Sequence, residues 1–351
     1  MEDNGSKKIV DLYYRANMNK YDIALENSNG KDFSKAEMVV LACLALVGRE
    51  AEMSKLPYYP SEVDYNKLIK AIIVSSLDGM TDGLTKKEEY DNLINYFKES
   101  NPEVYGSVVI YKSMLDNFAP YLDPVYPEEK FVYDHLKLHD VTRIGHLLWG
   151  VKAERKESVL EHIYGCLVLA VGMESEYSYD IDFSKLYKML LIHEVGETSK
   201  IGDQSQFQMT DEERLRYERE AARRILLQPY GGQKLYDLWE EFNTHAESES
   251  LFAYLIDKLE YNMQVKAYDD MNMFDFENRP VNKATTNGRV LEIINNGANS
   301  VFDVHYEFDK SKFFRVPCMR RILEEVKNYH FVKGEIVKPE RTVIPRIVLK
   351  K

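Results

Sequence analysis

The middle of the chain, from about residue 135 to 272, consists of successive stretches with the apolar spacing of helices, without strand-like alternation between them. This spacing predicts helices over residues 158–171, 183–197, 210–227, 233–242 and 247–268. Consecutive helices must bury their apolar faces against one another. We therefore expect an all-α fold in which this region forms a helical bundle.

Helical patterns also precede this region. Ser34-Lys-Ala-Glu37 has the sequence of a capping box and stands directly before the apolar run 38–47. Prolines in 118–127 end helices and mark a domain boundary, and the Val- and Ile-rich tail 335–349 suits an edge strand or an extended arm. A chain of 351 residues is long enough for two or three domains. We predict a helical N-terminal domain at 1–130, a central domain at 135–272 and a short mixed C-terminal extension at 273–351.

The charge balance argues against two classes of partner. Asp and Glu total 58 and Lys and Arg total 46, so the formal net charge is −12. Non-specific binding to nucleic acid or to an anionic membrane requires surplus positive charge, so we expect neither. The longest apolar run is shorter than the roughly 20 residues of a membrane span. The polar N-terminus and the absence of a CxxC pair favour a cytoplasmic protein without a disulfide scaffold.

Three predicted helices hold ionisable side chains in apolar surroundings, in the order His162, then His193-Glu194 with Glu197, then Asp257. A buried carboxylate needs a partner, because an unpaired charge in a dry core is very costly. A single His in an apolar helix is more often a core or interface residue, and a single Asp often bonds a backbone amide or an Arg. Imidazoles and carboxylates from three separate helices favour a divalent transition metal instead.

Three motifs resemble those of the HD-domain phosphohydrolases, above all the branch of bacterial 5'-deoxynucleotidases and their eukaryotic relatives. These motifs are Arg143-Ile-Gly-His146, Glu157-Ser-Val-Leu-Glu-His162, and His193-Glu-Val-Gly-Glu197 with Gly202-Asp203 after it. Segments 217–221, 238–241 and 256–260 also fit this branch. The resemblance covers about residues 135–272, under half of the chain.

The resemblance implies an HD-domain bundle and a metal-dependent phosphohydrolase that acts on a small-molecule nucleotide, with a (deoxy)nucleoside 5'-monophosphate as the expected substrate. One divalent metal ion (Mn, Co, Fe, Ni, Zn or Mg) would be bound by His162, His193, Glu194 and Asp257. Glu197 would orient or activate the attacking water, and Asp203 would contact the sugar or help to place the water. Arg143 would hold the phosphate, and His146, where the branch usually has Trp, would pack against base or sugar. The branch also implies a homodimer.

The chain departs from the family in the dyad itself, because His-Asp is replaced by His193-Glu194. Glutamate keeps an oxygen ligand but adds one methylene, so the carboxylate must fold back or the metal must move. A misplacement near 1 Å can cost about a hundredfold in rate. Two functions therefore remain open: an active hydrolase, and a catalytically degenerate HD-fold protein that binds a nucleotide or acts as a scaffold.

Overall fold

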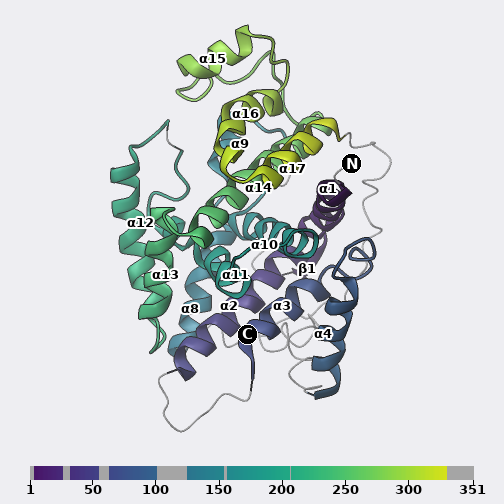
Figure 1. The fold of residues 1–351 in the computed structure, drawn as a ribbon. Coiled ribbons are helices and arrows are strands. Elements are labelled where there is room, and N and C mark those ends of the chain that lie inside the picture. The colour runs from purple at the N-terminus through teal and green to yellow at the C-terminus, as the bar shows by residue number, and fades with distance from the viewer. Residues whose placement is uncertain are drawn as a thin grey trace.

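The computed structural model describes residues 4–26, 32–54, 63–100, 125–153, 156–205 and 207–329. Within these ranges the chain is almost entirely helical, which confirms the all-α prediction (Figure 1). The exception is one antiparallel pair of short strands, β1 (Ile23–Glu26) and β2 (Asp32–Ser34), which the sequence did not predict. Most of the proline-rich stretch 118–127 and the whole tail 335–349 lie outside the described residues.

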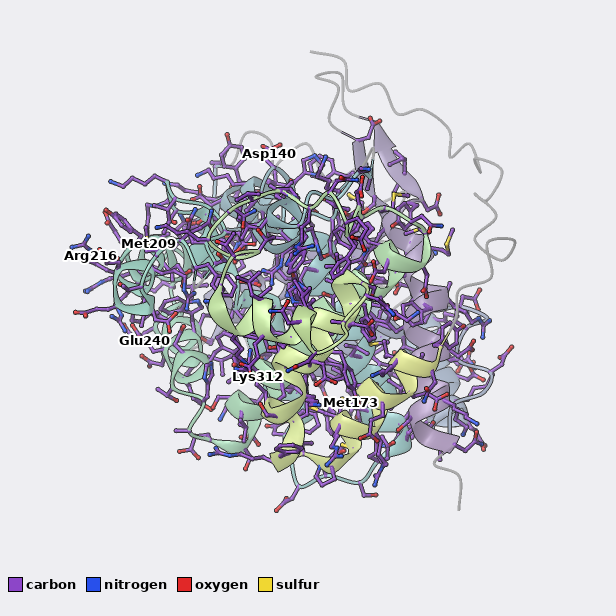
Figure 2. All side chains as sticks on the ribbon, turned by 90° about the horizontal axis from the view of Figure 1, so that it is seen from above. Asp140, Met173, Met209, Arg216, Glu240 and Lys312 are labelled. Atoms are coloured by element: carbon purple, nitrogen blue, oxygen red, sulfur yellow. The ribbon has the colours of Figure 1, made fainter. Side chains whose placement is uncertain are left out.

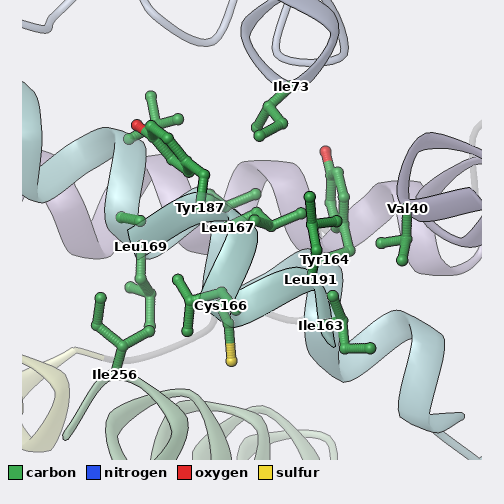
Figure 3. Close-up of a cluster of buried hydrophobic side chains, with 14 of the residues drawn as sticks. Val40, Ile73, Ile163, Tyr164, Cys166, Leu167, Leu169, Tyr187, Leu191 and Ile256 are labelled. Carbon is green, nitrogen blue, oxygen red and sulfur yellow. The ribbon is translucent and has the colours of Figure 1, made fainter. Parts of the chain in front are cut away.

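Helix α10 (Val159–Glu176) is the centre of the fold, and nearly all of its residues are buried. A helix that is apolar on every side must be covered on every side. It packs against α1 (Asn4–Asn17), α2 (Lys35–Met53), α11 (Phe183–Ile192) and α14 (Ser248–Asp270). Figure 3 shows the resulting core, in which α10 side chains lie among Val40, Ile73, Leu191 and Ile256.

The other helices surround this centre. They are α3 (Tyr65–Ser75), α4 (Lys87–Ser100), α8 (Pro127–His135), α9 (Ile144–Leu148), α12 (Asp211–Leu226), α13 (Gln233–Thr244), α15 (Gly288–Asn295), α16 (Val301–Asp309) and α17 (Pro317–Asn328). Short 3-10 helices are η1 (Met18–Lys20), η2 (Leu136–His139), η3 (Val195–Thr198) and η4 (Lys310–Arg315). Helices α16 and α17 both pack on α14, and α17 also contacts α1, so the two ends of the described chain meet on the central bundle.

Helices α12 and α13 form one flank of the molecule, and Figure 2 shows Arg216 and Glu240 at its outer edge. Helix α12 packs against η3, which follows directly after α11. Among the described helices, none combines the length and the hydrophobicity that a membrane span requires.

Capping boxes fix the starts of two core helices. The predicted box at Ser34 is confirmed: the Glu37 amide donates to Ser34 Oγ (3.2 Å), and the Ser34 amide donates to Glu37 Oε2 (2.8 Å). Ser158 and Glu161 form the same arrangement at the start of α10. Ser158 Oγ also donates to Glu37 Oε1 (2.6 Å), so the N-termini of α2 and α10 are joined.

The helix predicted over residues 183–197 is shorter than expected, because α11 ends at Ile192. Glu194 has φ −93° and ψ 5°, outside the helical region, and η3 begins after it. Trp239 Nε1 donates to the His193 carbonyl (3.1 Å), and the Glu197 amide donates to the carbonyl of Glu194 (3.0 Å), a three-residue step. These contacts end the regular helix and turn the chain at the dyad.

Candidate active site

Four predicted metal ligands meet at one point: His162 of α10, His193 and Glu194 after α11, and Asp257 of α14. A ligand atom from each lies within 4.8 Å of those of the others, and the His and Asp side chains among them are buried. His162 Nε2 lies 3.3 Å from Glu194 Oε1 and 3.2 Å from Asp257 Oδ1. His193 Nε2 lies 3.5 Å from the same oxygen of Glu194. The turn after Ile192 directs both dyad side chains to this point.

Both imidazoles present Nε2 to the centre of this group. His193 Nδ1 donates to the Leu190 carbonyl (2.7 Å), and its buried Nε2 has no hydrogen-bond partner in the described part of the chain. His162 Nδ1 lies 2.5 Å from Glu260 Oε2. A metal-binding histidine usually donates its second ring N–H to a carbonyl or carboxylate. Two imidazole nitrogens and two carboxylates, arranged in this way, fit one divalent transition metal.

Arg143 lies against the ligand group and is only 8% exposed. Its Nη1 is 2.6 Å from Glu194 Oε1 and 3.4 Å from Glu197 Oε1, and its Nη2 is 3.5 Å from Asp257 Oδ1. Burial lowers the pKa of Arg143, but the carboxylates of Glu194, Asp203 and Glu197 outweigh it and raise the pKa well above its usual value. The site therefore has a permanent positive charge beside its ligand atoms.

The neighbouring carboxyl groups titrate in opposite directions. Burial favours the neutral form of Glu194, but Arg143 and His193 outweigh it, so the pKa of Glu194 falls well below its usual value. For Glu197, burial and then the charges of Asp203 and Glu194 raise the pKa well above its usual value. Carboxyl groups whose environments separate their pKa values suit different roles, as an ionised ligand and as a proton-exchanging group.

The remaining predicted residues, Asp203 and His146, lie in different positions relative to the site. Asp203 Oδ2 accepts from the Ile144 amide (2.7 Å) and is 3.9 Å from Arg143 Nη1, so it fixes the backbone that presents the guanidinium. His146 is fully buried, with its Nε2 3.1 Å from Glu157 Oε2. Its ring stacks on Tyr261 at a centroid distance of 5.0 Å. Tyr261, and not His146, faces the open space of the site.

A cavity of about 550 Å³ opens onto this group. Besides the ionisable residues, aromatic and apolar side chains of α9, α14, α16 and the chain after α9 line it, including Trp149, Tyr261, Val304, His305 and Phe308. Sequence reasoning missed these residues. Tyr261 follows Asp257 by four positions and so shares its helix face, a signal that could have identified it. Nothing local in the sequence indicates that α16 covers the site.

Comparison with known proteins identifies the family to which this region belongs. An HD domain model matches residues 135–298, which include all four candidate ligands. The chain is 31% identical over 141 residues to the 5'-deoxynucleotidase HDDC2 of Dictyostelium discoideum, covering 38% of this chain and 73% of that protein. It is 30% identical over 138 residues to the Homo sapiens 5'-deoxynucleotidase HDDC2, covering 38% and 65% respectively. The chain therefore belongs to the HD-domain phosphohydrolases, in the branch that contains these 5'-deoxynucleotidases.

Proposed function

We propose that this protein removes the phosphate from a nucleoside 5'-monophosphate, with deoxynucleotides as the preferred class. The observation that supports this best is the group of two imidazoles and two carboxylates with the guanidinium of Arg143 beside it, all opening onto one cavity. When bound, a divalent ion polarises a phosphoryl oxygen and lowers the pKa of water in the site. His162, His193, Glu194 and Asp257 would hold that ion.

The other residues of the site have distinct tasks in this proposal. Arg143 binds the phosphate through its two terminal nitrogens, because a planar guanidinium matches two phosphate oxygens at once. Glu197, whose pKa is raised well above its usual value by burial and by the charges of Asp203 and Glu194, exchanges a proton with the attacking water. Asp203 holds the Ile144 amide and thereby keeps Arg143 in place.

The rest of the cavity suits a nucleoside. Its volume lies within the range of small-molecule sites, roughly 300–1,000 Å³. Aromatic side chains such as Trp149 and Phe308 offer flat apolar surfaces for a base. Lys258 and Lys312 also line the cavity, but each ammonium lies 2.7 Å from an aspartate oxygen. Their pairing leaves little positive charge for additional phosphates, which favours a monophosphate over a di- or triphosphate.

The test is phosphate release from a panel of ribo- and deoxynucleoside monophosphates with added Mn or Co. His193→Ala removes a ligand, and Lys188→Ala, on α11 just before the dyad and paired with Glu50, is the matched control. We expect release by the wild type and the control and loss in His193→Ala. Absence of release from every nucleotide by a metal-loaded protein would contradict this substrate class. Absence of both release and metal binding would favour the degenerate, nucleotide-binding or scaffold alternative.

A further inference from the structure

Two buried polar side chains approach the metal-ligand group from the N-terminal part of the chain, outside the segment that matches the HD domain model. Lys20 of η1 is 3% exposed, and its Nζ lies 2.8 Å from Glu260 Oε1 and 2.5 Å from Glu157 Oε1. The Tyr13 hydroxyl of α1 donates to the same oxygen of Glu260 (2.7 Å). Figure 1 shows α1 beside α10, and the two helices pack together.

Glu260 connects these side chains to the proposed metal site. Its second oxygen, Oε2, lies 2.5 Å from Nδ1 of His162, while Nε2 of the same ring faces Glu194 and Asp257. Orientation of a metal-binding imidazole through its second nitrogen fixes both its tautomer and its ring plane. The position of Glu260 therefore determines the direction in which His162 presents its ligand atom.

We propose that Tyr13, Lys20, Glu157 and Glu260 form a positioning network through which the N-terminal region holds His162 for metal binding. The proposal rests on the metal site of the proposed function. It assigns a role to a part of the chain that lies outside the match to the HD domain model, and to Glu157, for which the motif alone gives none. None of the four is a catalytic residue, because each acts through His162.

The charges of the network explain why Lys20 is required. Two carboxylates are buried around one ammonium, whose remaining hydrogen-bond capacity is used by Gln264 Oε1 at 3.1 Å. Burial alone lowers the pKa of Lys20, but Glu157 and Glu260 outweigh it and raise the pKa above its usual value. Without the ammonium, the two carboxylates would repel each other in a dry environment, where charge interactions are strong. Glu260 would then move away from its position under His162.

The backbone of α10 is also adapted to this network. A Cβ atom at Gly165 would lie 2.2 Å from Glu260 Oε1, so glycine at this point leaves room for the Glu260 side chain in its observed position. Glu157 extends the network in the other direction, through its Oε2 contact with His146 Nε2 (3.1 Å). The network thus joins α1, η1, α10 and α14 behind the ligand group.

The test measures binding of Co(II) alone, without nucleotide. The variants are Lys20→Met and Tyr13→Phe, and the matched control is Lys8→Met. Lys8 also lies on the N-terminal region and pairs with α10 through Glu176 (3.0 Å), but not within the network. The readouts are the dissociation constant from chelator competition and the visible absorption spectrum of bound Co(II), which reports ligand geometry.

We expect Lys20→Met to weaken Co(II) binding by roughly ten- to a hundredfold and to alter the spectrum. Tyr13→Phe should weaken binding less, with an altered spectrum, and Lys8→Met should match the wild type. A cooperatively folded Lys20→Met protein with wild-type affinity and spectrum would overturn the proposal. If Lys20→Met does not fold, Tyr13→Phe serves as the test, because it removes only a hydroxyl. Wild-type Co(II) affinity and spectrum in Tyr13→Phe would then overturn the proposal.

The same measurements separate this proposal from the proposed function. A wild-type protein that binds no Co(II) would overturn the network together with the metal site. In a different outcome, the wild type binds Co(II), the two variants bind it more weakly, and the wild type hydrolyses no nucleotide. This outcome would support the network and contradict only the proposed substrate class.

Discussion

One oxygen of Glu194, Oε1, lies 2.6 Å from Nη1 of Arg143 and also within 3.5 Å of Nε2 of both His162 and His193. The side chain that replaces the aspartate of the family dyad therefore reaches the centre of the site. Glu194 lies two residues after the end of α11, where the backbone is no longer helical. The extra methylene is accommodated by this geometry, which favours an intact site over a degenerate one.

The first prediction concerns Glu194→Asp. Shortening the side chain withdraws its carboxylate from both imidazoles, and a misplacement near 1 Å costs about a hundredfold in rate. We expect weaker Co(II) binding and a fall of about a hundredfold in kcat/KM for a deoxynucleoside monophosphate. Glu240→Asp, on α13 and paired with Arg219, is the control, because it shortens a glutamate by the same methylene outside the site. A marked gain of activity in Glu194→Asp would instead identify the natural glutamate as a sign of lost catalysis.

The second prediction separates the two properties of Arg143. Its guanidinium competes for the carboxylates that would bind a metal, and it also provides the charge that would bind a phosphate. Arg143→Met should therefore tighten Co(II) binding while it lowers kcat/KM by at least about a hundredfold, a typical cost of removing a group that stabilises developing charge. Calorimetric titration with Co(II) and nucleotide hydrolysis measure the two effects, with Arg219→Met as control.

A parallel fall of metal binding and activity in Arg143→Met would contradict this prediction. It would mean that the guanidinium holds the carboxylates in place and that the site collapses without it.

The sequence predicts those parts of the site that depend on local pattern. The apolar spacing of α10 and α14 and the order of His162, His193-Glu194 and Asp257 are sufficient to bring imidazoles and carboxylates into one bundle. The capping box at Ser34 is equally local, because its two partners are three residues apart.

The remaining features depend on contacts between distant parts of the chain. The end of α11 depends on Trp239 of α13, whose indole N–H donates a hydrogen bond to the His193 carbonyl. His146 does not line the cavity, because it is held by Glu157 (3.1 Å) and stacks on Tyr261, contacts that no local pattern reveals. The residues around Lys20 are those of an ordinary polar helix end and do not predict that it is buried. Its position between two glutamates results from tertiary packing.

The third prediction concerns Gly165, which lies in the middle of α10. Alanine at an interior helix position normally adds stability, by about 1 kcal/mol relative to glycine. At Gly165 its Cβ would collide with Glu260 Oε1 at 2.2 Å, so we expect Gly165→Ala to lower the melting temperature and weaken Co(II) binding. Gly172→Ala, in the same helix, would place its Cβ nearest to the Ile9 and Leu12 side chains, outside the network, and should leave Co(II) binding unchanged. Equal Co(II) affinity in both variants would contradict the prediction.

The fourth prediction concerns the acid stability of the fold. Burial of the His135 ring, which packs on Phe131, lowers its pKa to about 4. The hydrogen bond from its Nδ1 to the Phe131 carbonyl (2.7 Å) and the charge of Asp134 act in the opposite direction but are outweighed. The unfolded chain binds this proton near pH 6.5 and the folded chain only near pH 4. The contribution of His135 to stability is therefore complete above pH 6.5 and is lost as the pH falls toward 4, by about 3 kcal/mol in total.

Urea unfolding of the wild type and His135→Leu between pH 7 and pH 4 measures this contribution. The variant loses a hydrogen bond at every pH. Its free energy of unfolding should nevertheless decline less steeply below pH 6.5, because both proteins contain the same other titrating groups and only the wild type contains His135. Parallel pH profiles of the two proteins would show that His135 is not responsible for the acid dependence.

The fifth prediction tests whether α16 contributes to base recognition. Phe308 lines the cavity, and Arg289 lies 4.3 Å from the centre of its ring, which holds the ring in position. Loss of one aromatic contact with a base corresponds to about tenfold in affinity. Phe308→Ala should raise the KM for a deoxynucleoside monophosphate about tenfold, without changing the KM for deoxyribose 5-phosphate, which has the same phosphate and sugar but no base. Phe314, exposed and outside the cavity lining, provides the control variant Phe314→Ala. Equal increases for both substrates would place Phe308 at the phosphate or sugar instead, and would leave the base to other walls of the cavity.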